Sequence, residues 1–453
     1  MSILVVSGVT PMSQGSEATI VRAFVSGDIR IRMSQVAPGD MDRLKARLRF
    51  ANPAYVNAAR LGLRAWGIPR ELECYNELGP HISIPRGAAK LVKEVIPNVC
   101  FVDRRSACER VILPRDIPLR DYQQAAVDAF CKKRQGYVVI PCGGGKTRIA
   151  LGIIGRLGLK TLVLVHTRDL QSQWQSEAAK FDLPVTVRTI QGLMETADRF
   201  NTVNGCDLLI VDEAHHIAAP TFHSLVHLSS ARYRLGLTAT PDRADGLNDF
   251  LRLYFGGLVY KISHADLVER GVLVVPEIRC VNTGFKYPYK NSGDYAPMIQ
   301  ALVGDVDRNN LILDTVVDSI GPGDVGLVLS NRVEHCRDLA RFLRLRGLRA
   351  EDVTGKVSKK EREKRLEAAR KGEIQVLCAT SLADEGLDLP ILSRVYLAFP
   401  ARAQARTAQR LGRLMRPHPD KGAAILFDFC DPVKVLRSQY AARRRLYTRV
   451  LGA

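Results

Sequence analysis

The 453-residue sequence predicts an α/β fold with two parallel-sheet domains in tandem, preceded by a small α+β domain. From about Pro118 onward, short apolar runs typical of strands alternate with amphipathic runs typical of helices, which is the pattern of parallel sheets with crossover helices. This pattern occurs twice, with an aperiodic stretch between the two series. The length also exceeds the size at which one core keeps growing, so two to four domains are expected.

The chain is strongly basic. Its 66 Lys and Arg residues outnumber 47 Asp and Glu residues, giving a net charge of +19 and a pI near 9.7. Such a charge suits a polyanionic partner such as nucleic acid, although a well-solvated surface or a membrane surface explains dispersed charge equally well. No apolar stretch is long enough to span a bilayer, and the N-terminus lacks the charged start of a signal peptide. We therefore expect a cytoplasmic protein with no membrane partner.

The ten cysteines are scattered between Cys74 and Cys430, and none forms a CxxC pair. This spacing predicts reduced intracellular thiols, with neither structural zinc nor disulfides.

Residues 1–112 are expected to form an accessory nucleic-acid-binding domain of α+β type. Residues 18–25 and 28–33 alternate like a hairpin around Ser26-Gly27, and residues 42–50 have helical spacing. Basic residues are interleaved here with aromatic ones, a mixture that can pair phosphates and stack bases. The alternative is that the aromatics are core residues and the arginines are solvated. The set comprises Arg43, Lys45, Arg47, Arg49, Arg60 and Arg64 with Phe50, Tyr55 and Trp66.

Residues 113–262 are expected to form the first parallel-sheet domain. Its predicted strands are 136–140, 161–165, 208–211, 233–237 and 258–260. Most of these runs end at a polar or Gly-rich motif, and ligands of such sheets bind at the carboxyl ends of the strands.

Residues 263–300 show no clear helical or strand period and are interpreted as a linker with an insertion. Residues 301–453 are expected to form the second sheet domain. The predicted strands of that domain are 326–329, 350–353, 374–378, 394–398 and 423–427, and its predicted helices are 333–346, 359–370 and 434–450. The last helix carries six Lys or Arg residues and no acid, which favours a surface that meets phosphate.

The segment 141–147 is a candidate phosphate loop that follows an apolar strand. Backbone N–H groups around Gly143, Gly144 and Gly145 can wrap phosphates, and Lys146 adds a positive charge beside the β- and γ-phosphates. Thr147 is the expected Mg²⁺ ligand. Ile140 stands where the usual pattern has its first Gly, so the loop alone is a moderate signal.

A pair of acids closes the apolar strand 207–211. Asp212 is expected to hold Mg²⁺, and Glu213 to orient and deprotonate the attacking water. A solvated Asp-Glu turn is the alternative, but it does not explain an acid pair that ends an apolar strand downstream of a phosphate loop. His215 is interpreted as a hydrogen-bonding relay rather than a metal ligand. The hydroxyls of segment 238–241 follow another strand and are suited to hydrogen-bond the acid pair.

A third signature, residues 409–416, lies far away in the second half of the chain. Its Arg413 and Arg416 supply mobile positive charge that can reach the γ-phosphate as it leaves. The order of the signatures predicts a nucleotide held between two domains.

Taken together, these and other segments resemble the motifs of superfamily 2 helicases. Within that group they resemble the XPB and phage UvsW type, and they are also similar to the motor of restriction-enzyme R subunits. The matching segments are 119–123, 162–170, 189–193, 212–215, 328–331, 379–388 and 409–416. The resemblance implies two RecA-like motor domains that hydrolyse ATP with Mg²⁺ and bind DNA, whether single-stranded, duplex or branched. His166 and Gly144 depart from the usual residues, but neither change removes a charged catalytic group.

The resemblance also implies site residues. Arg120 and Gln123 fall in the segment before the phosphate loop, where Gln123 reads the adenine edge, and Gly386, Asp388 and Gln409 complete the ATP site. The implied nucleic-acid contacts are Thr167, Arg168, Gln191, Gly192, Ser330, Asn331, Thr380 and Ser381.

Residues 81–87 are similar to a Pro-Arg-Gly stretch ahead of the motor in some phage-type relatives, which implies a DNA-engaging accessory domain. The alternative is a Pro-Gly turn with a solvated Arg86.

The expected function is that of an ATP-dependent DNA helicase or translocase in repair, recombination or processing of replication forks and branched DNA. An ATP-switched nucleic-acid binding or remodelling module without strand separation is an alternative from another class, and an RNA helicase is a third, disfavoured one. The sequence does not determine the oligomeric state, although a monomer is favoured.

Overall fold

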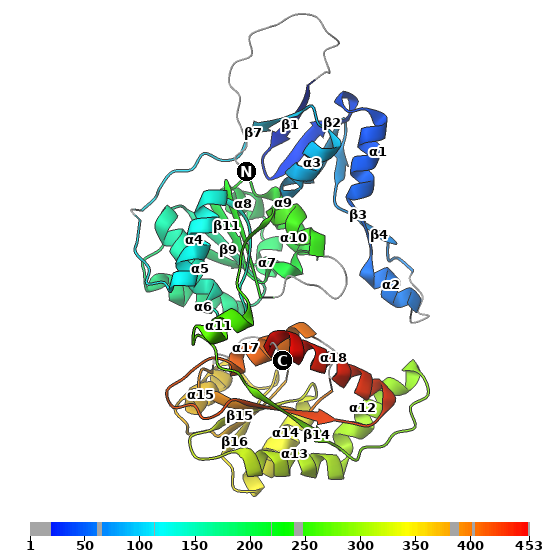
Figure 1. Cartoon of the computed structure of the whole chain (residues 1–453), viewed down its shortest axis with the longest axis vertical. Coiled ribbons are helices and arrows are strands. Elements are labelled where there is room, and N and C mark those ends of the chain that lie inside the picture. The colour runs from blue at the N-terminus through cyan, green and yellow to red at the C-terminus, as the bar shows by residue number, and fades with distance from the viewer. Residues whose placement is uncertain are drawn as a thin grey trace, which may run out of the picture. The chain divides into compact units, whose positions relative to one another are not determined.

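The computed structural model describes residues 20–60, 66–112, 114–218, 220–239, 248–380, 389–400 and 404–451. The chain divides into two compact units, one made of Met1–Ile140 and Gly145–Ile262, the other of Pro141–Gly144 and Ser263–Ala453 (Figure 1). Each unit contains one large parallel sheet, and the first also carries the small N-terminal α+β region, so the predicted fold class is confirmed. No helix among the described residues is long and apolar enough to cross a membrane.

The large sheet of the first unit has six parallel strands in the order β10-β9-β11-β12-β8-β13. The strands are β8 (Gln135–Val139), β9 (Thr161–Val165), β10 (Val185–Thr189), β11 (Leu208–Val211), β12 (Tyr233–Thr238) and β13 (Leu258–Lys261). Every residue of β9 and β11 is buried, as expected for strands covered on both faces. The helices of this region are α4 (Asp121–Lys133), α5 (Lys146–Leu157), α6 (Arg168–Ala179), α7 (Ile190–Met194), α8 (Arg199–Asn204), α9 (Pro220–Leu228) and α10 (Asn248–Phe255).

The N-terminal region has its own mixed sheet in the order β5-β6-β2-β1-β7. Its strands are β1 (Val21–Val25), β2 (Asp28–Arg32), β5 (Asn76–Leu78), β6 (His81–Pro85) and β7 (Val99–Asp103), with the separate pair β3 (Arg49–Ala51) and β4 (Glu71–Glu73) and the helices α1 (Pro38–Arg47), α2 (Pro53–Arg60) and α3 (Ala89–Val95). The predicted hairpin around Ser26-Gly27 is therefore present. Helix α1 begins four residues before the predicted start, because a proline is favourable in the first turn.

Two buried arginines join the N-terminal sheet to the large sheet of the first unit. Arg234 on β12 donates to the carbonyl oxygens of Gly27 (3.0 Å), Ser229 (2.8 Å) and Tyr254 (3.0 Å). Arg86 donates to the carbonyls of Ser26 (3.2 Å) and Ala231 (2.7 Å). Burial lowers the pKa of both guanidinium groups, that of Arg234 to about 9. Each side chain thus satisfies backbone acceptors that meet where the two sheets pack.

The Pro-Arg-Gly stretch therefore serves in packing within the first unit, and the alternative of a solvated Arg86 is wrong, since this side chain is almost fully buried. The adjacent Gly87 packs directly on the backbone of α10: a Cβ atom there would lie 2.3 Å from the Arg252 carbonyl oxygen. At the hairpin turn, a Cβ on Gly27 would lie 2.3 Å from the His227 carbonyl oxygen. Only glycine permits these two close backbone approaches.

The N-terminal region and the large sheet of the first unit also share one continuous hydrophobic core. Phe50, for example, meets Phe250 edge to face with 5.2 Å between ring centroids. The boundary expected after residue 112 consequently does not separate two compact units. A polypeptide lacking residues 1–112 would expose this core.

Much of the basic set noted in the N-terminal sequence is engaged by acids. The pairs are Arg43 with Asp40, Lys45 with Glu77, Arg47 with Glu94 and Arg49 with Glu73. Phe50 packs against the core, as the alternative interpretation expected, whereas Trp66 is 97% exposed. Arg64 lies outside the described residues, and Arg60 ends α2.

The sheet of the second unit has six parallel strands in the order β14-β19-β18-β15-β17-β16. The strands are β14 (Glu277–Asn282), β15 (Val325–Leu329), β16 (Ala350–Val353), β17 (Val376–Ala379), β18 (Leu392–Leu397) and β19 (Ile425–Cys430). The helices are α11 (His264–Glu269), α12 (Tyr295–Gly304), α13 (Val306–Ser319), α14 (Val333–Leu345), α15 (Lys359–Arg370), α17 (Gln404–Leu414) and α18 (Lys434–Leu451).

The stretch 263–300 is not a linker with an insertion, which corrects the expectation from the sequence. It belongs to the second unit and supplies α11, the edge strand β14 and the first part of α12. Because most residues of β14 are exposed or half-buried, this strand has no apolar run that the sequence pattern could reveal. Cys280 and Cys430 form a disulfide between β14 and β19, so the expectation of reduced cysteines without disulfides is wrong for this pair.

The close packing at Gly87 gives a testable prediction. We expect Gly87→Ala to lower the free energy of unfolding by about 1–3 kcal/mol, because the added methyl group must displace the backbone of α10. Gly39→Ala is the matched control, since nothing lies within 4 Å of its added Cβ. Urea unfolding of both variants measures the effect. Equal stability of the two variants would contradict this account of the packing.

Candidate ATP site

The expected ATP-site residues converge at one edge of the first large sheet. Strands β11, β12 and β8 are neighbours and run parallel, so their carboxyl ends emerge side by side. Asp212 follows β11, Thr238 ends β12, and the chain after β8 leads through the phosphate loop to Lys146 at the start of α5. The topology thus brings together groups that are widely separated in the sequence.

Lys146 and Glu213 form an ion pair at this edge. Lys146 Nζ lies 2.9 Å from Glu213 Oε1, and both side chains are largely buried. Burial alone would raise the pKa of the Glu213 carboxyl, but Lys146 and the neighbouring His215 outweigh it and hold that pKa below its usual range. Glu213 is therefore an ionised carboxylate whose nearest cation is the lysine of the phosphate loop.

The backbone of Glu213 is strained. Its φ of 48° lies in the left-handed region, which among described residues other than glycine is shared only with Arg134 and Asp182. That conformation costs on the order of 1–2 kcal/mol for a residue with a Cβ. The Glu213 N–H donates to Asp212 Oδ1 at 2.9 Å and helps to hold the turn. Strain of this kind is concentrated at functional sites.

Asp212 is oriented by Trp174, a residue whose role was not predicted from the sequence. The Trp174 indole N–H on α6 donates to Asp212 Oδ2 at 2.9 Å, and both residues are buried. Burial and the charge of Glu213 raise the pKa of Asp212. The only signal in the sequence was a tryptophan in the helix after the second predicted strand of this domain. A buried indole N–H needs a hydrogen-bond acceptor, but the sequence does not show which residue supplies it.

His215 lies between Glu213 and the end of β12. Its Nδ1 atom is 3.3 Å from Glu213 Oε2 and 3.2 Å from Thr238 Oγ1. Thr238 thus reaches the acid pair through His215, whereas Thr240 lies outside the described residues. This geometry favours the relay role, which remains a hypothesis.

Gln123 packs against the phosphate loop. Its Oε1 accepts the backbone N–H of Arg120, the N-cap residue of α4, at 3.0 Å. A Cβ atom on Gly145 would lie 2.5 Å from Gln123 Nε2, and Gly145 has a φ of 80°. Gly143 also has a positive φ, and the Gly144 N–H donates to the Pro141 carbonyl within the loop. Glycine is thus required where the loop turns into α5.

The four nucleic-acid contacts expected in the first unit follow β9 and β10 at the same sheet edge. Thr167 caps α6 and accepts the Leu170 N–H at 3.3 Å, while Arg168 is exposed. Gln191 and Gly192 are exposed at the start of α7. Arg168, Gln191 and Gly192 therefore present groups at the surface.

In the second unit, the expected contacts are unequally accessible. Ser330 is 2% exposed, and its hydroxyl lies 2.9 Å from His335 Nδ1, whereas Asn331 is exposed. Thr380 is buried at the end of β17. Arg413, in the last turn of α17, and Arg416, two residues after its end, are both half-buried, and α17 also contains Gln409. Ser381, Gly386 and Asp388 lie outside the described residues.

The donor set fits a magnesium nucleotide. Asp212 offers carboxylate oxygens, and Thr147, the second residue of α5, offers a hydroxyl, which are the oxygen ligands that Mg²⁺ prefers beside phosphate. Glu213 Oε2 forms no hydrogen bond with the described residues, although His215 Nδ1 lies 3.3 Å away, so it remains able to accept from a water. These residues would hold Mg²⁺, which would supply positive charge beside the phosphates.

Two parallel sheets, the first with a phosphate-loop lysine and a buried acid pair at its carboxyl edge, define a nucleotide-hydrolysing motor. Residues 116–183 and 179–243 match the family described as "Type III restriction enzyme, res subunit", and residues 308–418 match "Helicase conserved C-terminal domain". Both halves of the chain are thus similar to helicase-type families, and the resemblance to superfamily 2 helicases of the XPB and restriction R-subunit type, drawn from the motifs, is confirmed. The protein is accordingly an ATP-hydrolysing enzyme.

Two curated relatives illustrate the similarity. The DNA 3'-5' translocase XPB2 of Sulfurisphaera tokodaii is 27% identical over 362 residues, which cover 68% of this chain and 81% of that protein. The DNA 3'-5' helicase XPB of Mycobacterium tuberculosis is 29% identical over 364 residues, covering 73% of this chain and 63% of that protein. The chain therefore spans less than two thirds of the mycobacterial relative.

Solved structures agree on the fold. A fragment of an HsdR subunit of a type I restriction enzyme from Vibrio vulnificus aligns with a TM-score of 0.59 and 19% identity, covering 75% of this chain and 68% of the other. The restriction-modification enzyme LlaBIII, solved bound to DNA, aligns with a TM-score of 0.56 and 14% identity, covering 80% of this chain and 32% of that one. At these identities the likeness concerns the fold alone.

The Trp174–Asp212 hydrogen bond yields a prediction for the site. Trp174→Phe keeps a buried aromatic ring but removes the N–H donor, so we expect the turnover of ATP to fall several-fold and the Mg²⁺ concentration for half-maximal activity to rise. ATP hydrolysis measured across a Mg²⁺ titration checks this. Unchanged Mg²⁺ dependence at unchanged stability would show that Trp174 serves only in packing.

Proposed function

We propose that this protein is an ATP-dependent DNA helicase or translocase that couples ATP hydrolysis to movement along DNA. The observation that carries the proposal is the buried Lys146–Glu213 pair beside Asp212, at the same sheet edge as the exposed Arg168 and Gln191. The names of the relatives, a DNA translocase and a DNA helicase, support DNA as the polymer. Such a protein would act inside the cell, on DNA.

Each residue of the site has a chemical role in this proposal. Lys146 binds the β- and γ-phosphates, and Thr147 and Asp212 hold Mg²⁺, which when bound neutralises developing phosphate charge. Glu213 orients the attacking water and accepts its proton. Gln123 lies where it can recognise the base, and Arg413 and Arg416 supply further positive charge to the γ-phosphate.

The Lys146–Glu213 pair suggests how nucleotide binding prepares the base. When Lys146 Nζ turns from Glu213 to a phosphate oxygen, Glu213 loses its nearest cation. The pKa of the carboxylate then rises from its lowered value, and a carboxylate of higher pKa is a stronger base. Glu213 would therefore become reactive only when phosphate occupies the loop.

Contacts to nucleic acid in this proposal are made mainly to the sugar-phosphate backbone. The exposed groups at the ends of β9, β10 and β15 are a guanidinium, side-chain amides and backbone N–H groups, which suit phosphate more than base edges. We therefore expect weak sequence preference and strong dependence on salt. Movement without strand separation remains a distinct outcome that the same site would support.

Two substitutions test the ATP site. We expect Lys146→Ala to abolish DNA-stimulated ATP hydrolysis, and Glu213→Gln to bind ATP but to hydrolyse it at least about 10²-fold more slowly, because only the base is lost. Nucleotide binding is measured by equilibrium dialysis and turnover by phosphate release. Near-normal turnover in Lys146→Ala, or loss of ATP binding in Glu213→Gln, would refute the assigned roles.

The polymer and the reaction are tested with the full-length wild-type chain. We expect single-stranded, duplex or forked DNA to stimulate ATP hydrolysis more than RNA does. Strand displacement beside triplex displacement then distinguishes a helicase from a translocase, since a translocase removes only the third strand. Stimulation by RNA alone would overturn the choice of DNA.

A further inference from the structure

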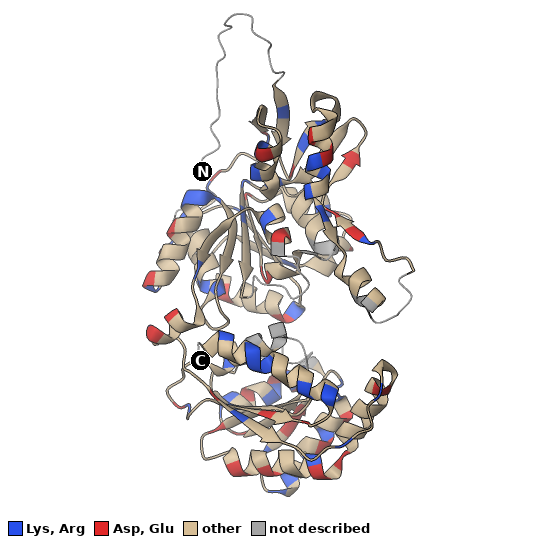
Figure 2. Ribbon diagram, turned by 45° about the vertical axis from the view of Figure 1, so that its right-hand side comes forward, with Lys and Arg blue, Asp and Glu red and all other residues tan. Residues whose placement is uncertain are grey.

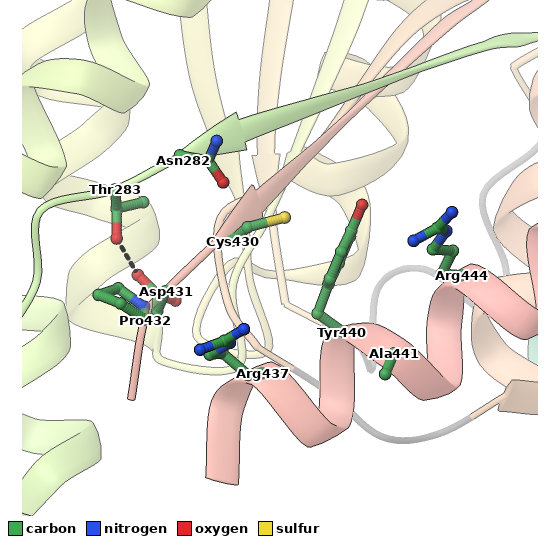
Figure 3. A pocket seen from close by; sticks show the side chains of 9 residues that line it. All are labelled: Asn282, Thr283, Cys430, Asp431, Pro432, Arg437, Tyr440, Ala441 and Arg444. Carbon is green, nitrogen blue, oxygen red and sulfur yellow. Dashed lines mark hydrogen bonds between the residues drawn. The ribbon is translucent and has the colours of Figure 1, made fainter. Parts of the chain in front are cut away.

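A pocket of about 490 Å³ lies at the edge of the second sheet, beside α18 (Figure 3). It is lined by Asn282, Thr283, Cys430, Asp431, Pro432, Arg437, Tyr440, Ala441 and Arg444. The pocket opens at the carboxyl ends of β14 and β19, and all strands of this sheet are parallel. It therefore shares an edge with Asn331 after β15, an expected nucleic-acid contact.

One face of α18 supplies the functional groups of this pocket. Arg437, Tyr440 and Arg444 are spaced three and four residues apart, so they lie on the same side of the helix, with Tyr440 between the two arginines (Figure 3). Arg437 and Arg444 are exposed, and neither side chain forms an ion pair or hydrogen bond with any described residue. Two guanidinium groups thus flank a half-buried aromatic ring.

The acid in the pocket does not neutralise these arginines. Asp431, the single acid among the lining residues, accepts from Arg308 Nε at 2.7 Å and from Thr283 Oγ1 at 2.6 Å, and all three are buried. Its charge is therefore compensated from within the unit. Figure 2 shows further Lys and Arg along α18, near the label C, and the helix contains no Asp or Glu. The pocket is accordingly an uncompensated cationic site.

The helix that carries the site is firmly anchored. Arg443 donates to both carboxylate oxygens of Asp428 on β19, at 2.8 and 2.7 Å, and the Tyr447 hydroxyl donates to Asp428 at 2.7 Å. The Arg443 guanidinium also lies 5.8 Å from the centre of the Tyr440 ring. Tyr440 is therefore held on a rigid element, which reduces the entropic cost of stacking a ligand on it.

We propose that this pocket is an additional contact for single-stranded nucleic acid, in which Arg437 and Arg444 bind backbone phosphates and Tyr440 stacks on a base. The proposal rests on the proposed function, because it extends the strand path along the edge of the second sheet. Positive charge combined with an aromatic platform is the usual composition of single-strand sites.

The spacing favours a strand over a free nucleotide. Arg437 and Arg444 are two helical turns apart, about 10 Å along the axis, which corresponds to about three stacked nucleotides. A strand held at two such phosphates presents a base at Tyr440 between them. One mononucleotide would place its phosphates against only one of the two arginines.

Stacking is tested with Tyr440→Ala and Tyr440→Phe. We expect Tyr440→Ala to bind an oligothymidylate about tenfold more weakly than wild type, and Tyr440→Phe to bind it normally, because every base has a face that an aromatic ring can stack on. With an oligonucleotide of the same length made of abasic sites, Tyr440→Ala should bind as wild type does. Fluorescence anisotropy measures both affinities, and thermal unfolding verifies that the variants fold.

The arginines are tested through the salt dependence of binding. We expect Arg437→Gln and Arg444→Gln each to reduce the slope of log affinity against log salt by about one. Arg445→Gln is the matched control, since Arg445 is exposed on the same helix but does not line the pocket. An unchanged slope in both pocket variants would overturn the phosphate contacts.

The remaining outcomes separate this inference from the proposed function. If the wild-type chain neither binds DNA nor shows DNA-stimulated ATP hydrolysis, both proposals fail. If the wild type does both while Tyr440→Ala, Arg437→Gln and Arg444→Gln match it, the pocket proposal alone fails. If these variants lose a second bound ATP in equilibrium dialysis but keep their affinity for the oligothymidylate, the pocket binds a mononucleotide and the proposal is overturned.

Discussion

The burial of two adjacent carboxylates at the end of β11 is the constraint on which the ATP site depends. Asp212 and Glu213 follow a strand whose residues are all buried, so neither acid can be left without partners. The surrounding residues meet this demand in different ways: Lys146 by charge, Trp174 by an indole N–H, and His215 through its imidazole. The catalytic apparatus and the means of tolerating buried charge are thus the same set of side chains.

This dependence gives the resting site a defined electrostatic state. Before phosphate arrives, Lys146 is paired with Glu213, the base that it later releases, so this ion pair carries no net charge. Phosphate, with its greater negative charge, competes for Lys146. Breaking such a buried ion pair costs free energy unless a replacement partner is present. Glu213 is therefore released from Lys146 only when a nucleotide phosphate takes its place.

Sequence reasoning located the parts of the molecule that repeat a simple pattern. The strands 161–165 and 208–211 agree with the structure at both ends, because continuous apolar runs mark buried parallel strands. Edge strand β14 escaped notice, since its mostly exposed residues carry no such run. Trp174 and Arg234 also escaped notice, because their roles depend on partners 38 and 207 residues away that only the fold brings near.

The pairing of charged side chains likewise depends on the fold and could not be predicted from the sequence pattern. Arginines counted in the sequence as candidates for nucleic acid in the N-terminal region are largely paired with acids, whereas Arg437 and Arg444 on α18 are not paired with any described residue. Composition gives the number of cations, but pairing depends on tertiary neighbours. Surface charge therefore has to be assessed residue by residue before it supports a binding site.

The hairpin turn at Gly27 limits how such proteins can be recombined. Its backbone packs closely on the backbone at the C-terminal end of α9, and its carbonyl accepts a hydrogen bond from Arg234 of the large sheet, so the two surfaces are closely complementary. The N-terminal region is consequently not an interchangeable module. A chimera that joins this region to the motor of a relative would also need the complementary surface of this motor in order to fold. That surface includes Arg234 and the part of α10 on which Gly87 packs.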